Sequence, residues 1–172
     1  MSRAFVKEPD GDQAETDVLE RPQSRHPNYI TLQGLEGMKL RVESLRQQQT
    51  TLKAQADNLT VKNQIKMLEA DLRYLEKRIQ SAIPVNVATQ TGNEIRFGAT
   101  VKLVDKEDTR YEFTIVGEDE ANADKKSISW VSPLARELLG KKAGDIVIWQ
   151  RPAGDLELDI LSVNFKSGRQ SD

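Results

Sequence analysis

The stretch IVGEDEANADKKSISWVSPLARELLGKKAGDIV, Ile115 to Val147, decides the fold, because two strand-like runs and one short helix follow each other in it. Ser127 to Val131 is predicted to be a short strand, and Ser132 and Pro133 to begin a helix. Ser can accept a hydrogen bond from the free amides of a first turn, and Pro has no amide to lose there. Gly140 is predicted to end the helix, since glycine adopts the left-handed conformation that closes one. The stretch has no His, Cys or nucleophile–base pair, so we do not predict a catalytic site in it.

Strand-like runs on both sides of this stretch predict a small antiparallel sheet. Upstream, Ile95 to Val104 is expected to pair with Arg110 to Val116 across a polar turn. Downstream, Asp145 to Trp149 and Leu156 to Phe165 flank the turn-forming sequence Pro-Ala-Gly-Asp. We therefore expect residues 95–165 to form an α+β domain of about five antiparallel strands around one short helix.

Residues 31–83 carry a coiled-coil pattern, in which side chains recur alternately three and four positions apart. The first seam contains Leu35, Met38, Val42, Leu45, Gln49, Leu52, Ala56 and Leu59. The second seam contains Val61, Ile65, Leu68, Leu72, Leu75, Ile79 and Ala82. The two seams are out of phase, and the jump falls in the segment Asp57-Asn58-Leu59-Thr60, whose Asp and Asn favour a turn.

This phase jump predicts an N-terminal antiparallel helical hairpin with arms of about 23–25 residues, each about 35 Å long. Thr31 is the expected cap of the first helix and Thr60 that of the second. The alternative is one long helix that dimerises as a parallel coiled coil. Gln49 and Ala56 weaken the first seam, so such a dimer would be poorly stabilised.

The remaining segments are expected to lie outside these two parts. Residues 1–30 are polar and rich in Pro, and we predict a disordered tail; residues 84–94 are predicted to be a linker and residues 166–172 a second tail. His26 has no second ligand nearby, so a solvated histidine is expected rather than a metal or catalytic one. The carboxylates of residues 118–124 lack the order of an EF-hand, which predicts a solvated loop and no metal.

The composition of the 172 residues fits a soluble cytoplasmic protein. The chain has no cysteine, which excludes disulfides and thiolate metal sites. No apolar run approaches the length of a membrane span, and the first residues lack the apolar core of a signal peptide. The net charge of −2 hides an asymmetry, because residues 31–83 hold nine Lys and Arg against six Asp and Glu. Residues 84–165 hold ten against fourteen, so a mildly basic helical part precedes an acidic domain.

Four motifs resemble the C-terminal domain of the bacterial GreA/GreB transcription elongation factors. They are FGATV at 97–101, IVGEDEA at 115–121, SPLARELLGKKAGD at 132–145 and PAG at 152–154. Four motifs in the same order over about 70 residues make a chance match improbable. The resemblance implies an FKBP-like domain that docks on RNA polymerase at the mouth of its secondary channel. Gre factors also begin with a helical hairpin, so the resemblance extends to residues 31–83 in architecture.

The resemblance also implies where docking occurs. The expected partner-binding residues surround the turn before the helix: Trp130, Val131, Ser132 and Pro133. Many Gre factors have Asp or Asn immediately before the Ser-Pro pair, whereas this chain has Val131, which removes a polar contact. Trp130 has two open interpretations, packing in the core or a role at the interface. Ser132 and Pro133 could have no role beyond starting the helix.

In the Gre family, acidic side chains at the hairpin tip help the polymerase hold a catalytic Mg²⁺ and cut its own RNA. A hard, hydrated cation needs at least two oxygen ligands close together. The predicted tip contains Asp57 and Asn58 and only this one carboxylate, and Glu43 and Glu69 are each more than ten residues away. The family's acidic tip motif is not found, so the sequence does not predict efficient stimulation of cleavage.

The sequence therefore predicts a protein, not itself an enzyme, that binds bacterial RNA polymerase at the secondary channel and regulates elongation. We expect a monomer that needs no cofactor, and we leave contact with RNA or DNA in the elongation complex open. The regulator of nucleoside diphosphate kinase is a similar short-hairpin relative. The alternatives are a cleavage-stimulating Gre factor, a coiled-coil adaptor, and a prolyl isomerase. The last would need an aromatic-lined pocket, and aromatic residues are only 5% of the chain.

Overall fold

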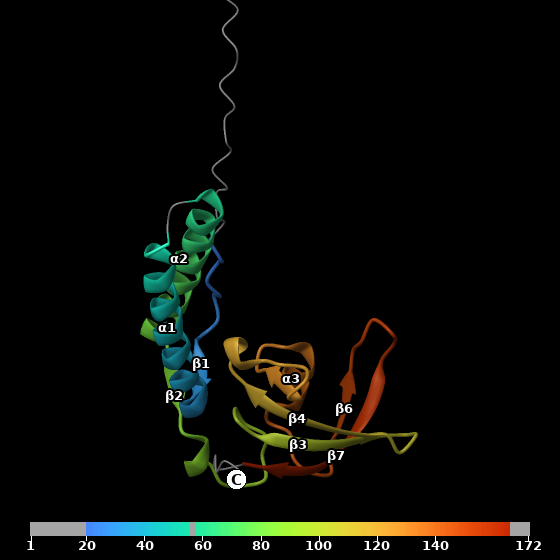
Figure 1. Cartoon of the computed structure of the whole chain (residues 1–172). Coiled ribbons are helices and arrows are strands. Elements are labelled where there is room, and N and C mark those ends of the chain that lie inside the picture. The colour runs from blue at the N-terminus through green and yellow to red at the C-terminus, as the bar shows by residue number, and fades with distance from the viewer. Residues whose placement is uncertain (1–19, 56–57, 166–172) are drawn as a thin grey trace, which may run out of the picture.

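Two helices of 22 residues each, α1 (Leu32–Lys53) and α2 (Leu59–Gln80), form an antiparallel hairpin (Figure 1). The structure is a computed structural model that describes residues 20–55 and 58–165. Each arm is about 33 Å long at 1.5 Å per residue. The side chains buried between the arms all belong to the two predicted seams: Met38, Val42, Leu45, Leu68 and Leu72. The predicted hairpin is therefore confirmed, and the single long helix is not formed.

The caps of the two helices differ in how well the sequence predicts them. Thr31 caps α1 as expected, because its hydroxyl oxygen accepts a hydrogen bond from the Gly34 amide at 2.9 Å. Thr60 was the predicted cap of α2, and this prediction is wrong. The side-chain oxygen of Asn58 accepts from the Val61 amide at 2.8 Å, so the helix begins two residues earlier. Asn is among the best N-cap residues, which explains the choice. Asp57 lies outside the described residues.

A two-stranded parallel sheet closes the open end of the hairpin. It consists of β1 (Tyr29–Thr31) and β2 (Ile83–Val85). A 3-10 turn, η1 (Val87–Thr89), follows on the way to the C-terminal domain. The prediction of a disordered tail through residue 30 is wrong at its end, since Asn28 is only 5% exposed and Ile30 only 1%. Their partners lie about 50 residues further along the chain, which local composition does not reveal. Residues 1–19 and 166–172 lie outside the described residues.

The C-terminal domain contains a five-stranded sheet in the order β5-β4-β3-β7-β6. The strands are β3 (Thr100–Asp105), β4 (Arg110–Val116), β5 (Ser127–Ser129), β6 (Ile146–Trp149) and β7 (Leu156–Asn164). Both predicted antiparallel pairs form, β3 with β4 and β6 with β7. The predicted α+β class, with an N-terminal hairpin and a C-terminal β domain that contains one short helix, is confirmed.

One edge of this sheet differs from the antiparallel arrangement that the sequence predicts. β5 pairs with β4 in parallel, with Ile115 opposite Ile128. The chain leaves β4, passes through a 3-10 turn, η2 (Glu118–Glu120), and folds back through a tight turn before β5. Lys126 has a φ of 53° in that turn, and its carbonyl accepts from the Thr114 amide at 2.9 Å. The connection therefore reverses the chain twice, which brings β5 in parallel to β4.

The helix α3 (Pro133–Leu138) lies within the curl of the sheet (Figure 1). Its buried side chains are Leu134, Ala135 and Leu138. They belong to one buried cluster with side chains of four strands: Val101, Leu103, Ile115, Val147, Leu158 and Ile160. Burial of this apolar surface is the main force that holds the domain together. Within the described ranges, no helix is long and apolar enough to cross a membrane.

Candidate partner-binding surface

The turn before α3 is fixed by its own hydrogen bonds. The Ser132 hydroxyl oxygen accepts from the Ala135 amide at 3.3 Å, and Pro133 occupies the first helical position. The Ser132 amide donates to the Ser129 carbonyl at 2.9 Å. Ser132 and Pro133 thus have the helix-starting role that the sequence predicts. Pro133 is exposed and Val131 is half-buried, so part of this turn remains open to a partner.

Trp130 lies between the C-terminal domain and the segment that precedes the hairpin. Its amide donates to the Val116 carbonyl at 2.9 Å, which continues the pairing of β5 with β4. Its ring meets the rings of Tyr29 and His26 edge-on, with centroids 5.2 and 6.0 Å apart. The indole Nε1 is buried and has no hydrogen-bond partner among the described residues. Trp130 is therefore half-buried at an internal junction, and its role toward a partner stays a prediction.

The first three residues of the acidic loop (residues 118–124), Glu118–Glu120, bind the hairpin and its cap, contrary to the prediction of a solvated loop, whereas residues 121–124 are exposed as predicted. The Arg78 guanidinium, whose side chain is 3% exposed, lies 2.5 Å from Asp119 Oδ2 and 3.7 Å from Glu118 Oε2. The Tyr74 hydroxyl donates to Asp119 Oδ1 at 2.7 Å. Burial and this hydrogen bond raise the pKa of Tyr74. The prediction failed because the local sequence does not reveal Arg78, about 40 residues upstream, whose positive charge compensates the carboxylates.

Glu120 makes a second connection between the same two parts. Its carboxylate accepts hydrogen bonds from the Thr31 amide at 3.0 Å, the Thr31 hydroxyl and the Gly117 amide at 2.9 Å. The chains approach closely here, since a Cβ added at Gly117 would lie 2.4 Å from the Tyr29 carbonyl oxygen. The cap of α1 is thus tied to the start of η2. Together, Arg78 and Thr31 fix the base of the hairpin against the C-terminal domain.

Asn28 completes the buried part of this junction. Its side-chain amide donates to the Arg78 carbonyl at 2.7 Å and to the Ser81 hydroxyl at 3.1 Å. Its own carbonyl accepts from the Ile83 amide at 2.8 Å. These three hydrogen bonds of a buried residue hold the segment firmly at Asn28. The sequence offered one signal for it, a lone Asn-Tyr-Ile that interrupts an otherwise polar stretch.

The hairpin tip has a different character. Asn58 is exposed and caps α2, as described above, while its neighbour Asp57 lies outside the described residues. Glu69 is the next carboxylate along α2, and it is already engaged, because its Oε1 lies 2.8 Å from Gln49 Nε2 and 3.3 Å from Lys53 Nζ. In the part of the chain that the structure covers, no three His, Cys, Asp or Glu gather as a metal site would require.

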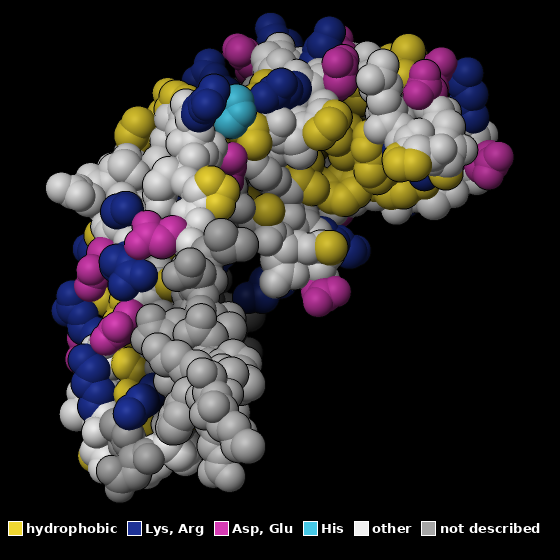
Figure 2. Space-filling view, turned by 90° about the horizontal axis from the view of Figure 1, so that it is seen from above, with side chains coloured by type: hydrophobic (Ala, Val, Ile, Leu, Met, Phe, Trp, Pro, Cys, Tyr) yellow, Lys and Arg dark blue, Asp and Glu magenta, His cyan; other side chains and the backbone are white. Residues whose placement is uncertain are grey.

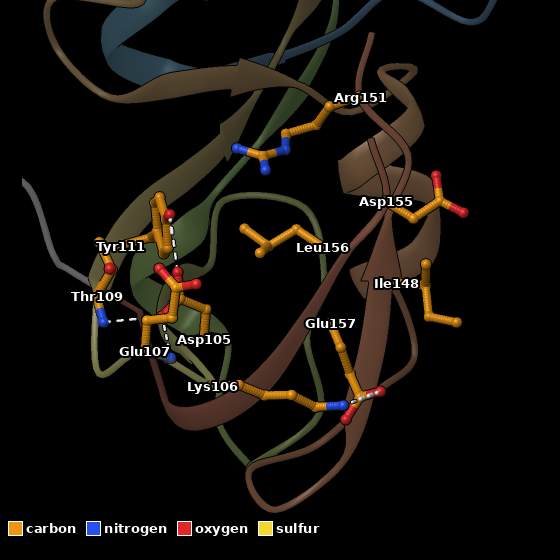
Figure 3. A pocket seen from close by; sticks show the side chains of 10 residues that line it. All are labelled: Asp105, Lys106, Glu107, Thr109, Tyr111, Ile148, Arg151, Asp155, Leu156 and Glu157. Carbon is orange, nitrogen blue, oxygen red and sulfur yellow. Dashed lines mark hydrogen bonds and ion pairs between the residues drawn. The ribbon is translucent and has the colours of Figure 1, made fainter. Parts of the chain in front are cut away.

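A concave region lies at the end of the sheet away from the hairpin, between the turn after β3 and the β6–β7 hairpin (Figure 3). Its volume is about 550 Å³, and Tyr111, Arg151 and Leu156 point toward its centre, whereas Ile148 points away (Figure 3). The Tyr111 ring stacks beside Phe113, and Trp149 meets both rings edge-on. The aromatic content of 5% is low for the aromatic-lined pocket that a prolyl isomerase needs, yet the rings of Tyr111, Phe113 and Trp149 contact one another.

Asp105 organises one wall of this region. Its Oδ1 accepts from the amides of Glu107 and Thr109, each at 2.9 Å, and its Oδ2 accepts from the Tyr111 hydroxyl at 3.1 Å. Desolvation by burial opposes ionisation, but the hydrogen bonds outweigh it and lower the pKa of Asp105. Burial and the bond to Asp105 raise the pKa of Tyr111. The three hydrogen bonds that the carboxylate accepts hold the β3–β4 turn against Tyr111.

Comparison with known proteins identifies the family. The model of the C-terminal domain of GreA/GreB transcription elongation factors matches residues 90–165. The transcription elongation factor GreA of Pseudomonas syringae pv. tomato is 41% identical over 115 residues, which cover 65% of this chain and 72% of that protein. The GreA of Nitratidesulfovibrio vulgaris strain DP4 is 41% identical over 100 residues, and the match spans only 61% of its length.

Among solved structures, the GreA factor homolog 1 (Gfh1) of Thermus thermophilus aligns over 81% of this chain and 99% of its own. The identity is 22% and the TM-score 0.40. The residues that match the family model, 90–165, include β3 to β7, η2 and α3, and the GreA of Pseudomonas syringae pv. tomato shares 41% identity over 72% of its length. The chain belongs to the GreA/GreB transcription elongation factor family.

Proposed function

We propose that this protein binds bacterial RNA polymerase at the rim of the secondary channel and regulates elongation without efficient stimulation of transcript cleavage. Its family membership and the intact turn before α3 support the docking half of the proposal. Trp130, Val131, Ser132 and Pro133 form the docking surface, and the hairpin is the part that enters the channel. Cleavage-stimulating activity is the second candidate, since the relatives are GreA proteins.

The composition of the hairpin tip supports the other part of the proposal, that the protein does not stimulate cleavage efficiently. Asp57 is the only carboxylate from residue 54 to residue 62. Glu69 cannot join it, because Lys53 and Gln49 hold its carboxylate on the side of the hairpin. One flexible carboxylate is a poor ligand set for Mg²⁺, which requires several oxygens in near-octahedral geometry. The hairpin therefore enters the channel without delivering a second metal ligand.

The junction between the two parts supports an orientation in which the hairpin acts as a unit with the docking domain. Arg78 and Thr31, at the base of α2 and α1, bind the acidic loop that precedes the docking turn. A hairpin about 33 Å long, fixed at its base, reaches a defined depth once the domain is docked. This protein would then obstruct the channel, or compete for it, by occupancy rather than by hydrolysis.

Val131 offers a direct test of the docking surface. Gre factors with Asp at this position gain a polar contact, so the full-length variant Val131→Asp is expected to bind polymerase more tightly than the unmodified chain. Ile148→Asp is the matched control, because it adds the same charge at an exposed apolar position on the far end of the sheet. The measurement is the dissociation constant for bacterial core polymerase. Absence of binding by the unmodified chain would overturn the proposal, and equal affinities would remove this surface from it.

A further inference from the structure

A short segment before the hairpin crosses the junction between its two parts. We name residues 20–27 the N-terminal strap. Figure 1 shows it in blue, between α2 and the C-terminal domain and descending to β1. Nothing in the docking or channel-entry role requires it. Its contacts connect α2, the acidic loop and Trp130 in turn, so it covers the junction from outside.

The outer half of the strap contacts the hairpin through exposed charges. Glu20 Oε1 lies 2.8 Å from Arg73 Nε, and Glu20 Oε2 lies 3.8 Å from Lys77 Nζ. The Arg21 guanidinium lies over the Tyr74 ring, 4.3 Å from its centroid. Exposed ion pairs and exposed cation–π contacts contribute little each, and salt screens them further. This half is therefore held weakly.

The inner half of the strap contacts the docking domain. The Ser24 hydroxyl donates to Glu118 Oε1 at 2.9 Å, and the His26 ring meets the Trp130 ring edge-on at 6.0 Å. A cleft of about 590 Å³ lies beside these contacts, between the strap, α2 and the acidic loop. Except for Ser24, which is half-buried, the residues of the strap are exposed. The strap thus shields one edge of Trp130 without being packed into the core.

The strap and the chain that follows it differ sharply in how firmly they are bound. Asn28 and Ile30 are buried, and Asn28 is held by three hydrogen bonds to Arg78, Ser81 and Ile83. Residues 20–27 could therefore leave the surface while β1 stays paired with β2. Release costs only the weak contacts described above, and the freed residues regain backbone entropy.

Two residues that the strap contacts, Trp130 and Glu118, each carry a buried polar atom without a hydrogen-bond partner in the described part of the chain. These atoms are Trp130 Nε1 and Glu118 Oε2. Glu118 Oε2 retains an ion-pair contact with Arg78 at 3.7 Å, but the indole N–H has nothing. A buried donor without an acceptor destabilises the arrangement that buries it. A partner that offers a carbonyl or carboxylate oxygen to the indole N–H would gain a hydrogen bond that the strap does not provide.

We infer that the N-terminal strap is an autoinhibitory cover on Trp130, which RNA polymerase displaces when it docks; this rests on the docking role proposed above. The polymerase segment that replaces it is a protein surface with an oxygen acceptor for the indole N–H. Loosening the strap therefore increases affinity for polymerase, whereas an ordinary structural role would lower it or leave it unchanged.

The test compares full-length variants. Glu20→Ala/Arg21→Ala/Ser24→Ala removes the two ion pairs of Glu20, the cation–π contact of Arg21 and the hydrogen bond of Ser24, and its affinity for bacterial core polymerase is expected to rise about tenfold. The matched control, Lys106→Ala/Glu157→Ala, removes an exposed ion pair at the far end of the sheet, leaves the net charge unchanged as the strap variant does, and is expected to leave the affinity unchanged. In a Trp149→Phe background, the strap variant is also expected to show faster acrylamide quenching of Trp130 fluorescence.

A charge exchange separates a specific contact from a general effect of charge. Glu20→Arg places a positive charge against Arg73 and Lys77, which loosens the strap and is expected to raise the affinity for polymerase. Adding Arg73→Glu restores an opposite-charge pair and is expected to return the affinity toward that of the unmodified chain. Equal affinities for the unmodified chain and the strap variant, or unchanged quenching, would overturn the strap inference alone. No binding by any variant, the unmodified chain included, would overturn the polymerase proposal and the inference with it.

Discussion

Gly117 lies where the C-terminal domain approaches the backbone of β1. Its φ of −65° suits any residue, but an added Cβ would lie 2.4 Å from the Tyr29 carbonyl oxygen and 2.9 Å from Glu120 Oε2. Gly117→Ala is expected to lower the free energy of unfolding by about 1–3 kcal/mol, as overpacking usually does. Urea denaturation measures the change.

Gly37 provides the control for that substitution. It lies within α1, and an added Cβ would have nothing within 4 Å. Gly37→Ala is expected to raise the free energy of unfolding by about 0.5–1 kcal/mol, because alanine loses less backbone entropy in a helix. If the two variants changed stability in the same direction, the close approach at Gly117 would not be the cause.

The lowered pKa of Asp105 predicts how the free energy of unfolding of the C-terminal domain changes with pH. Desolvation acts against its ionised form, but the hydrogen bonds it accepts lower its folded-state pKa below the ordinary value of 3.8. Its contribution is therefore present above that value and is lost as the pH falls through the folded-state pKa. The difference in unfolding free energy between the unmodified chain and Asp105→Asn is expected to be larger at about pH 6 than at about pH 3. A difference independent of pH would contradict this assignment.

At the scale of elements, the start of α2 tests whether the tip depends on Asn58. Asn58→Ala removes the bond to the Val61 amide and is expected to destabilise the helix by about 1 kcal/mol. Thr60→Ala is the matched control, since Thr60 is exposed one residue inside the helix and caps nothing. Thermal unfolding followed by circular dichroism compares them. A larger loss for Thr60→Ala would restore the cap predicted from the sequence.

The elements that the sequence predicted well are those whose signal is local. Seam residues such as Val42 and Leu72 repeat at helical spacing, and Ser132-Pro133 and Gly140 mark both ends of α3 within nine residues. The phase jump was enough to locate the turn of the hairpin, although not the capping residue. Strand pairs connected by short turns, such as β3 with β4, followed from the same local reasoning.

The elements that it missed depend on contacts between distant segments. Asp119 meets Arg78 from 41 positions away, and Asn28 meets Arg78 from 50. Neither the carboxylates nor the asparagine has a periodic or turn-forming pattern, so each was interpreted by its local composition as solvated. The sequence predicted the strand β5 but not its parallel direction, which follows from the two reversals of the chain through η2 and the turn before β5.

For the whole molecule, Arg78 is expected to determine whether hairpin and domain behave as one body. Arg78→Met leaves the carboxylates of Asp119 and Glu118 without their cation, and the expected loss is about 3 kcal/mol, as for other buried pairs that lose one partner. Calorimetry is expected to show the hairpin melting before the domain in this variant. Arg46→Met, which breaks an exposed pair with Glu76, is expected to cost less than about 1 kcal/mol. Equal losses would show that the junction is not coupled through Arg78.

The central claim is that the hairpin occupies the polymerase channel without supplying a metal-binding tip. RNA cleavage in backtracked bacterial elongation complexes tests it most directly, first with this protein alone and then with the protein titrated against a cleavage-active Gre factor. We expect no stimulation by the protein alone and dose-dependent suppression of the Gre factor. Stimulation by the protein alone, abolished in Asp57→Asn, would contradict the claim and show that a single carboxylate at the tip is sufficient.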